Sequence, residues 1–139
     1  MTEISCYYIS DLKCESIHQS SGKKILTDAP IDHKGKGESF SPTDLLATSL
    51  GTCLLTIMAI KARDNGWELE NINLNIKKIM TNNSDRKIKE LIVDIFLPNN
   101  LTQSKYDFLI KSSEQCPVTK SLSDSIFIKI KWHNQTKSN

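Results

Sequence analysis

The segment from Ser41 to Gly66 places the strongest constraint on how this chain folds. Its first four residues, Ser41-Pro42-Thr43-Asp44, are typical of a helix start. Serine suits the N-cap, proline suits the first helical position, and Asp44 can complete a capping box. Large apolar residues then recur at helical spacing as far as Ile60, and Asn65-Gly66 is a typical stop. The sequence therefore predicts a helix of about 25 residues, near 37 Å long.

This predicted helix is apolar on most of its sides, because Leu45, Leu55 and Ala59 lie outside the main apolar stripe. Such a helix is buried rather than laid on a surface. The chain has 139 residues, which suits one domain, and a domain of that size is about as wide as this helix is long. One chain offers few partners for every face of the helix, so we expect a homodimer that buries the rest.

Composition and charge are those of an ordinary soluble chain. Eighteen basic residues face sixteen acidic ones, a net charge of +2, so charge gives no reason to expect nucleic acid or a membrane as partner. The apolar segment falls short of the roughly 20 residues that span a bilayer, which also argues against a membrane. The N-terminus lacks a basic segment followed by an apolar run. We therefore expect no signal peptide and a cytoplasmic location.

Strand patterns lie on both sides of the helix. Three β-prone runs separated by turn formers precede it and predict an antiparallel meander. A loop of about a dozen residues, 28–39, follows and is long enough to suspect a functional role. After the helix, alternation and periodicity predict strand, strand, helix, short helical turn and strand, ending in a frayed tail at 134–139. The order β-β-β-α-β-β-α-α-β predicts an α+β fold in a single domain, 1–139. The predicted strands cover residues 4–9, 12–18, 23–27, 72–77, 87–97 and 126–132, and the later helices 102–114 and 117–122.

The four cysteines, at positions 6, 14, 53 and 116, are not spaced as metal ligands or as a secreted disulfide framework. No metal is therefore expected. In a reducing compartment cysteines are either inert core residues or reactive thiols. Cys6 and Cys14 fall on the first two predicted strands, where we interpret them as packing residues.

The residues alone leave the roles of Cys53 and Cys116 open. Cys53 shares a helix face with Leu50 and Ile57, which favours a small buried hydrophobe. It also lies about three turns into its helix, where the helix dipole no longer lowers a thiol pKa. Cys116 directly precedes Pro117, so its sulfur could occupy an N-cap and face free backbone N–H groups. Local physics would make Cys116 the more acidic thiol, although it could equally be a simple cap residue.

Two stretches resemble motifs of the OsmC/Ohr family, in particular its OsmC-like branch. The stretch from Ser41 to Cys53, SPTDLLATSLGTC, resembles the family's central helix motif. The stretch from Cys116 to Leu122, CPVTKSL, resembles its second cysteine motif. The resemblance spans essentially the whole chain. It implies an OsmC-like fold, with antiparallel sheets around a long central helix, in an intertwined homodimer with two active sites at the subunit interface.

The resemblance also implies an activity, that of a thiol-dependent peroxidase in oxidative stress defence. If the residue roles of the family are carried over to this chain, Cys53 is the thiolate that attacks the O–O bond of an organic hydroperoxide or of hydrogen peroxide. Cys116 then condenses with the resulting sulfenic acid to a disulfide, which an external thiol reductant must reduce. The chemistry implied needs no metal and no organic cofactor.

The chain departs from the family's well-characterised hydroperoxidases at the position of their thiolate-stabilising arginine. Those enzymes take it from the N-terminal half, but this sequence has no arginine before Arg63. The loop residues His33, Lys34 and Lys36 could supply a positive charge instead, although a lysine cannot reproduce the planar guanidinium fork. We therefore also consider a non-catalytic or redox-sensing protein that binds a small apolar ligand at the dimer interface, and a structural role with inert thiols.

A second departure lies at the start of the helix. Thr43 stands where the hydroperoxidases have glutamate, and its neighbour Asp44 resembles the acidic position of the OsmC-like branch. Asp44 is therefore a candidate supporting residue for the thiols. The alternative is the capping box, in which Asp44 only stabilises the helix start.

Overall fold

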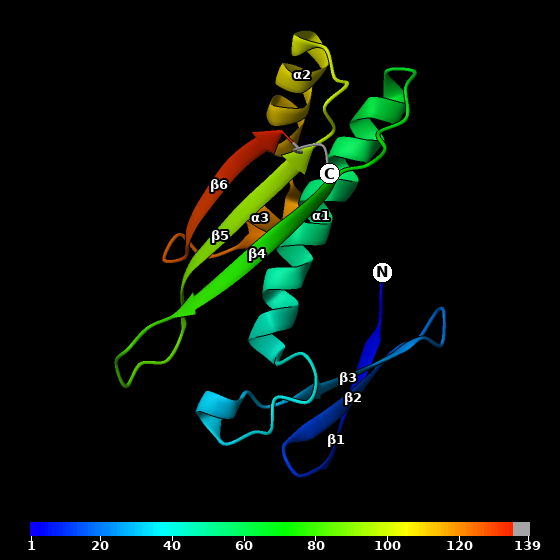
Figure 1. Ribbon diagram of the computed structural model, residues 1–139. Coiled ribbons are helices and arrows are strands. Elements are labelled where there is room, and N and C mark those ends of the chain that lie inside the picture. The colour runs from blue at the N-terminus through cyan, green and yellow to red at the C-terminus, as the bar shows by residue number, and fades with distance from the viewer. Residues whose placement is uncertain (135–139) are drawn as a thin grey trace, which may run out of the picture. The chain divides into compact units, whose positions relative to one another are not determined.

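The computed structural model describes residues 1–134, and its elements confirm the predicted α+β class and element order. Asn134 ends the last strand instead of beginning the predicted tail, and the rest of that tail lies outside the described residues. The elements, labelled in Figure 1, are β1 (Ile4–Ser10), β2 (Lys13–His18), β3 (Lys24–Asp28), a 3-10 helix (Ile31–His33), α1 (Pro42–Asp64), β4 (Asn73–Met80), β5 (Ile88–Leu97), α2 (Gln103–Ser113), α3 (Pro117–Ser121) and β6 (Phe127–Asn134).

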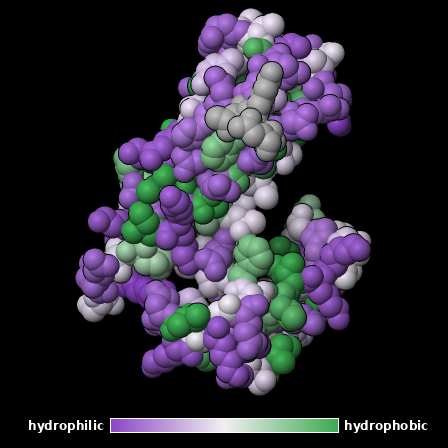
Figure 2. Space-filling view, in the orientation of Figure 1, coloured by the Kyte–Doolittle hydropathy of each residue, from purple (hydrophilic) through white to green (hydrophobic). Residues whose placement is uncertain are grey.

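The chain forms two compact units, Met1–Leu46 and the part from Ala47 onward. The first unit contains the predicted meander, in which β1, β2 and β3 pair in that order and antiparallel. None of its apolar side chains is buried; its buried residues are Thr27, Asp28 and Ser41. Figure 2 shows hydrophobic side chains at the surface in the region of these strands. The large ones that are exposed are Met1, Ile4, Tyr7, Tyr8, Ile9, Leu12, Ile25, Leu26, Ile31 and Phe40.

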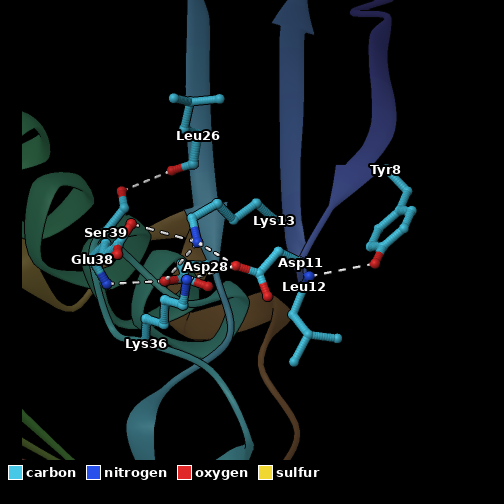
Figure 3. A network of polar contacts seen from close by, with 9 residues as sticks. All are labelled: Tyr8, Asp11, Leu12, Lys13, Leu26, Asp28, Lys36, Glu38 and Ser39. Carbon is cyan, nitrogen blue, oxygen red and sulfur yellow. Dashed lines mark hydrogen bonds and ion pairs between the residues drawn. The ribbon is translucent and has the colours of Figure 1, made fainter.

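A polar network ties the long loop after β3 to the meander (Figure 3). Its centre is the carboxylate of Asp28, which is only 1% exposed. Asp28 Oδ2 accepts the backbone N–H of Glu38 at 3.0 Å and lies 3.7 Å from Lys13 Nζ. Lys13 also lies 3.4 Å from the Glu38 carboxylate, and Lys36 pairs with Asp11 at 2.9 Å. A buried carboxylate needs such partners, so the network fixes where the loop leaves the sheet.

The second unit contains the sheet β4-β5-β6, in which one expectation was wrong. β4 and β5 pair antiparallel, as predicted, but β6 pairs parallel to β5. A parallel neighbour requires a crossover connection, and α2 and α3 supply it between β5 and β6. On the predicted face of β5, Leu91, Val93, Ile95 and Leu97 are each 0% exposed, and Ile88 at the start of the strand is also buried.

Helix α1 has 23 residues, close to the predicted length, and both of its ends follow the sequence signals. At the C-terminal end Gly66 has φ +84°, a left-handed conformation that glycine adopts without strain. Its N–H donates to the Arg63 carbonyl at 3.0 Å, and the Trp67 N–H donates to the Ala62 carbonyl at 3.1 Å. This pair of hydrogen bonds is a Schellman motif, which explains why the helix stops there.

One stripe of α1 is fully buried. In Figure 1 the helix passes behind β4, and Gly51 faces Leu74 of that strand. A Cβ at Gly51 would lie 3.0 Å from Leu74 Cδ1, so a larger residue there would require the Leu74 side chain to shift. The remaining apolar residues of the helix are half-buried or exposed. The buried residues of α1 are Ala47, Leu50, Gly51, Leu54, Met58 and Ala62.

By length and composition α1 could also cross a membrane, since its most apolar window has a mean hydropathy of 1.7. The expectation that this segment is too short for a span was therefore wrong as to length. One third of the window, 33%, is buried within the chain, and the core helix of a soluble protein passes the same test. The expected absence of a membrane partner stays a prediction.

Candidate functional site

The structure brings the two cysteines singled out by the sequence, Cys53 and Cys116, into contact. Cys53 lies in the middle of α1 and is half-buried, whereas Cys116 directly precedes α3 and is 0% exposed. Both belong to the second unit. The thiol of Cys53 hydrogen-bonds to the sulfur of Cys116, so residues far apart in the sequence form one dithiol group. Their redox roles stay predictions.

Cys116 occupies the N-cap of α3, as its position before Pro117 predicted. Its backbone is extended, with φ −60° and ψ 115°, and its sulfur accepts the Thr119 backbone N–H at 3.5 Å. Proline at the first helical position has no N–H to satisfy, so the next free donors face the sulfur. The N–H of Val118 interacts with the sulfurs of both cysteines.

These contacts shift the pKa values of the two thiols in opposite directions. Burial raises the pKa of Cys116, but hydrogen bonds from Cys53, Thr119 and Val118 outweigh burial and hold it below the ordinary thiol value. Burial also raises the pKa of Cys53, and the proton that it donates to Cys116 raises it further. The donors that face the Cys116 sulfur therefore favour ionisation of that thiol over ionisation of Cys53.

Two thiols in contact support two-electron sulfur chemistry. One sulfur can be oxidised by an electrophilic oxygen, and the other lies close enough to condense with it into a disulfide. Among the residues that the structure describes, no three His, Cys, Asp or Glu side chains are grouped so that they could hold a metal ion.

Asp44 forms the capping box that was the alternative to its supporting role. The Ser41 backbone N–H donates to Asp44 Oδ2 at 2.9 Å, and the Asp44 N–H donates to Ser41 Oγ at 3.1 Å. The role of Asp44 as a supporting residue for the thiols stays a prediction.

The first unit contains the positively charged loop candidates and the two other cysteines: His33, Lys34, Lys36, Cys6 and Cys14. Lys36, one of the three residues considered as a positive charge for the thiolate, is paired with Asp11, which raises its pKa. The roles suggested for His33 and Lys34 stay predictions. The interpretation of Cys6 as a packing residue was wrong, because Cys6 is exposed on its strand, whereas Cys14 is half-buried.

Sequence reasoning missed Val118 and Thr119 as functional candidates. Both lie inside the second cysteine motif, yet nothing in their residue types marks them as ligands of a sulfur. The available signal was positional: a cysteine at an N-cap exposes its sulfur to the N–H groups two and three residues later. Applied to Cys116, that rule points to Val118 and Thr119 as the donors that face its sulfur.

Comparisons with known proteins agree with this geometry. The family model described as OsmC-like protein matches residues 35–131. A crystal structure from Psychrobacter arcticus, of a proposed osmotic stress induced and detoxification response protein, is 40% identical with a TM-score of 0.88 and covers 96% of each chain. No curated protein sequence matches this chain.

More distant structures share the fold. The organic hydroperoxide resistance protein OsmC of Legionella pneumophila is 15% identical with a TM-score of 0.76, and the match covers 96% of each chain. The organic hydroperoxide resistance protein OhrB of Bacillus subtilis is 12% identical with a TM-score of 0.69, and the match covers 95% of this chain and 97% of that one. At such identities the likeness establishes the architecture only.

Proposed function

Because this chain belongs to the OsmC family, we propose that it is a thiol-dependent peroxidase that reduces organic hydroperoxides or hydrogen peroxide in oxidative stress defence. Cys53 is the sulfur that attacks the peroxide, and Cys116 resolves the product into a disulfide. An external thiol reductant then restores the dithiol, as a reducing cytoplasm would allow. Relatives named for hydroperoxide resistance support the substrate class by analogy of fold.

The observation that carries the proposal is the contact between the two thiols at a point where hydrogen bonds favour a negative charge. A thiolate, and not a thiol, is the reactive nucleophile. A resolving cysteine must also lie close to the first, because a disulfide joins Cα atoms within about 7 Å. The contact between Cys53 and Cys116 therefore supports both requirements of peroxide reduction.

The solvent exposure and the nucleophilicity of Cys53 both favour it as the thiol that attacks the peroxide. Its side chain is half-buried, whereas Cys116 is 0% exposed, so a peroxide meets Cys53 first. A thiol with a higher pKa is also the stronger nucleophile once it is ionised. Burial and the proton donated to Cys116 raise the pKa of Cys53, so its thiolate, when formed, is the more reactive of the two.

We propose that the protein is a homodimer. Its first unit has no buried apolar side chain, and nine large apolar residues from Ile4 to Phe40 are at least 44% exposed. A three-stranded sheet without a covered face is marginal in water. A second copy of the chain would cover these surfaces and the half-buried sides of α1. Light scattering at micromolar concentration is expected to give twice the monomer mass of 15.7 kDa, and a monomeric mass would contradict the dimer.

The peroxidase proposal is tested by the fate of the thiols. The reduced protein is mixed with one equivalent of an organic hydroperoxide, digested under non-reducing conditions, and its peptides are identified by mass. We expect a disulfide that joins the Cys53 and Cys116 peptides, and repeated turnover when a dithiol reductant is added. A Cys6→Ser, Cys14→Ser double variant serves as the control and is expected to behave in the same way. Oxidation confined to Cys6 or Cys14 would contradict the proposal.

A second candidate is a redox sensor that forms the same disulfide once. The raised pKa of Cys53 favours it, because a thiol that is mostly protonated reacts slowly. The two candidates differ in their kinetics. A peroxidase consumes many equivalents of hydroperoxide per protein in the presence of the reductant, whereas a sensor stops near one equivalent and stays oxidised.

A further inference from the structure

We propose that a pocket between the α1–β4 loop and the start of α2 binds a small zwitterion, an α-amino acid with a short side chain. Lys105 pairs with its carboxylate and Glu70 with its ammonium group. The pocket is separate from the candidate dithiol, because neither Cys53 nor Cys116 lines it. The proposal therefore goes beyond the proposed peroxidase function and does not depend on it.

The pocket lies where two loops of the second unit meet at one end of the sheet β4-β5-β6 (Figure 1). β4 and β5 are antiparallel, with Asn73 opposite Phe96, so the loop that enters β4 lies beside the loop that leaves β5. The first loop, residues 67–71, supplies one wall of the pocket. The second loop, together with Lys105 in the first turn of α2, supplies the other. Both loops adjoin neighbouring strands of one sheet, which holds the two walls at a fixed separation.

The indole ring of Trp67 lines the pocket, and two contacts hold it in place. Phe108 of α2 packs against it, with ring centroids 6.3 Å apart and an interplanar angle of 57°. The Lys105 ammonium group lies 4.6 Å from the centroid of the same ring. Tilted ring pairs and cation–π contacts both stabilise such an arrangement. The ring and the ammonium group are therefore positioned before a ligand binds.

Two opposite charges line the pocket without being paired to each other. Among residues 1–134, Lys105 and Glu70 form no ion pair with one another or with any other side chain. The neighbouring carboxylate of Glu68 is instead held by Arg63, whose Nε and Nη2 donate to its two oxygens at 2.9 and 3.3 Å. Glu70 and Lys105 thus keep their charges available for hydrogen bonds to a ligand, and such charge-assisted bonds are the strong ones.

The size and polarity of the pocket restrict the ligand. Its volume is about 130 Å³, and most of its surface is polar. A cavity of about 150 Å³ holds a benzene molecule, so this pocket suits a ligand of about six non-hydrogen atoms. Glycine, alanine and serine are of that size, whereas a nucleotide is far too large. The side chains of Asn71 and Asn100 place amide groups beside the two charges.

A ligand that carries a single charge suits the pocket less well than a zwitterion. A simple carboxylate would pair with Lys105 but would meet the like charge of Glu70. A simple amine would pair with Glu70 but would meet the like charge of Lys105. An α-amino acid pairs with both residues at once, and its short side chain can lie against the Trp67 ring. The two charges therefore favour an amino acid over either ion.

The test follows the Trp67 indole N–H signal of the wild-type protein by NMR while L-alanine is added. Trp132→Phe, which leaves Trp67 as the sole tryptophan, assigns the signal. A saturable shift is expected at millimolar alanine. Propionate and ethylamine each carry one of the two charges and are expected to bind roughly tenfold more weakly or worse, as for the loss of one charge-assisted hydrogen bond. The proposal is overturned if alanine gives no saturable shift, or if either single-charge compound binds as tightly as alanine.

Variants of the pocket check which side chains hold the ligand. Glu70→Gln and Lys105→Gln each remove one charge and are expected to weaken alanine binding roughly tenfold. Lys105→Arg keeps the positive charge and is expected to retain most of the affinity. Glu68→Gln is the matched control, because it removes a carboxylate that Arg63 already holds, and it is expected to leave binding unchanged. Equal weakening by Glu68→Gln and Glu70→Gln, or wild-type binding by Glu70→Gln, would overturn the assignment of Glu70.

These measurements involve neither a thiol reaction nor a peroxide, so the two proposals fail separately. If alanine does not bind while hydroperoxide is turned over, the pocket proposal is wrong and the peroxidase function holds. If alanine binds in the expected pattern while no hydroperoxide is consumed, the pocket proposal holds and the peroxidase function is wrong.

Discussion

Replacing Cys53 by serine is expected to lower the rate of hydroperoxide consumption about a thousandfold or more, which is the usual cost of removing a catalytic nucleophile. A serine hydroxyl is nearly the same size, so the helix should remain intact. Its oxygen, however, is not ionised near neutral pH and cannot take up the peroxide oxygen as a sulfenic acid. The measurement is the loss of organic hydroperoxide over time, with a dithiol reductant in excess.

The matched control for this variant is Cys6→Ser, which removes an exposed thiol from the first unit. It is expected to leave the rate unchanged and so to exclude a general effect of losing one cysteine. Thermal unfolding of both variants should match the wild type within a few degrees, since neither change leaves a large cavity. Unchanged peroxide consumption by Cys53→Ser, with its fold intact, would end the peroxidase assignment.

Replacing Cys116 by serine is expected to allow a single oxidation and then to stop turnover. Cys53 can still take the peroxide oxygen, but no neighbouring thiol remains to convert the sulfenic acid into a disulfide. Consumption should therefore show a burst of about one equivalent per chain, after which the sulfenic acid at Cys53 accumulates and turnover stops. A reagent that traps sulfenic acids should label Cys53 after the burst.

Trapping and mass analysis check that the added oxygen is on Cys53. Multiple turnovers at the wild-type rate would show that another thiol resolves Cys53, and the proposed pairing of the two cysteines would then be wrong.

Much of the fold follows from local signals in the sequence. Ser41 and Asp44 form a capping box and Gly66 ends α1 with a Schellman motif, because these interactions involve residues a few positions apart. The alternation along β5 identified its buried face for the same reason, since side chains on a strand alternate between two faces. The N-cap position of Cys116 was also local, because Pro117 follows it directly.

Other features depended on contacts between distant parts of the chain. The parallel pairing of β6 with β5 was not evident, because alternation has the same period in parallel and antiparallel strands. The exposure of Cys6 was missed because a β-prone run does not reveal which of its faces the rest of the chain covers.

The properties of the candidate site also fall into two groups, those that depend on neighbours in the sequence and those that depend on the folded chain. The sequence by itself determined that Cys116 caps a helix and that Cys53 lies on an apolar helix, because both properties depend on immediate neighbours. Only the tertiary structure decided that the two sulfurs meet and that hydrogen bonds hold the pKa of Cys116 below that of an ordinary thiol while the pKa of Cys53 is raised. The physical reason is that a pKa depends on every donor that folding brings to the sulfur, and those donors come from separate helices.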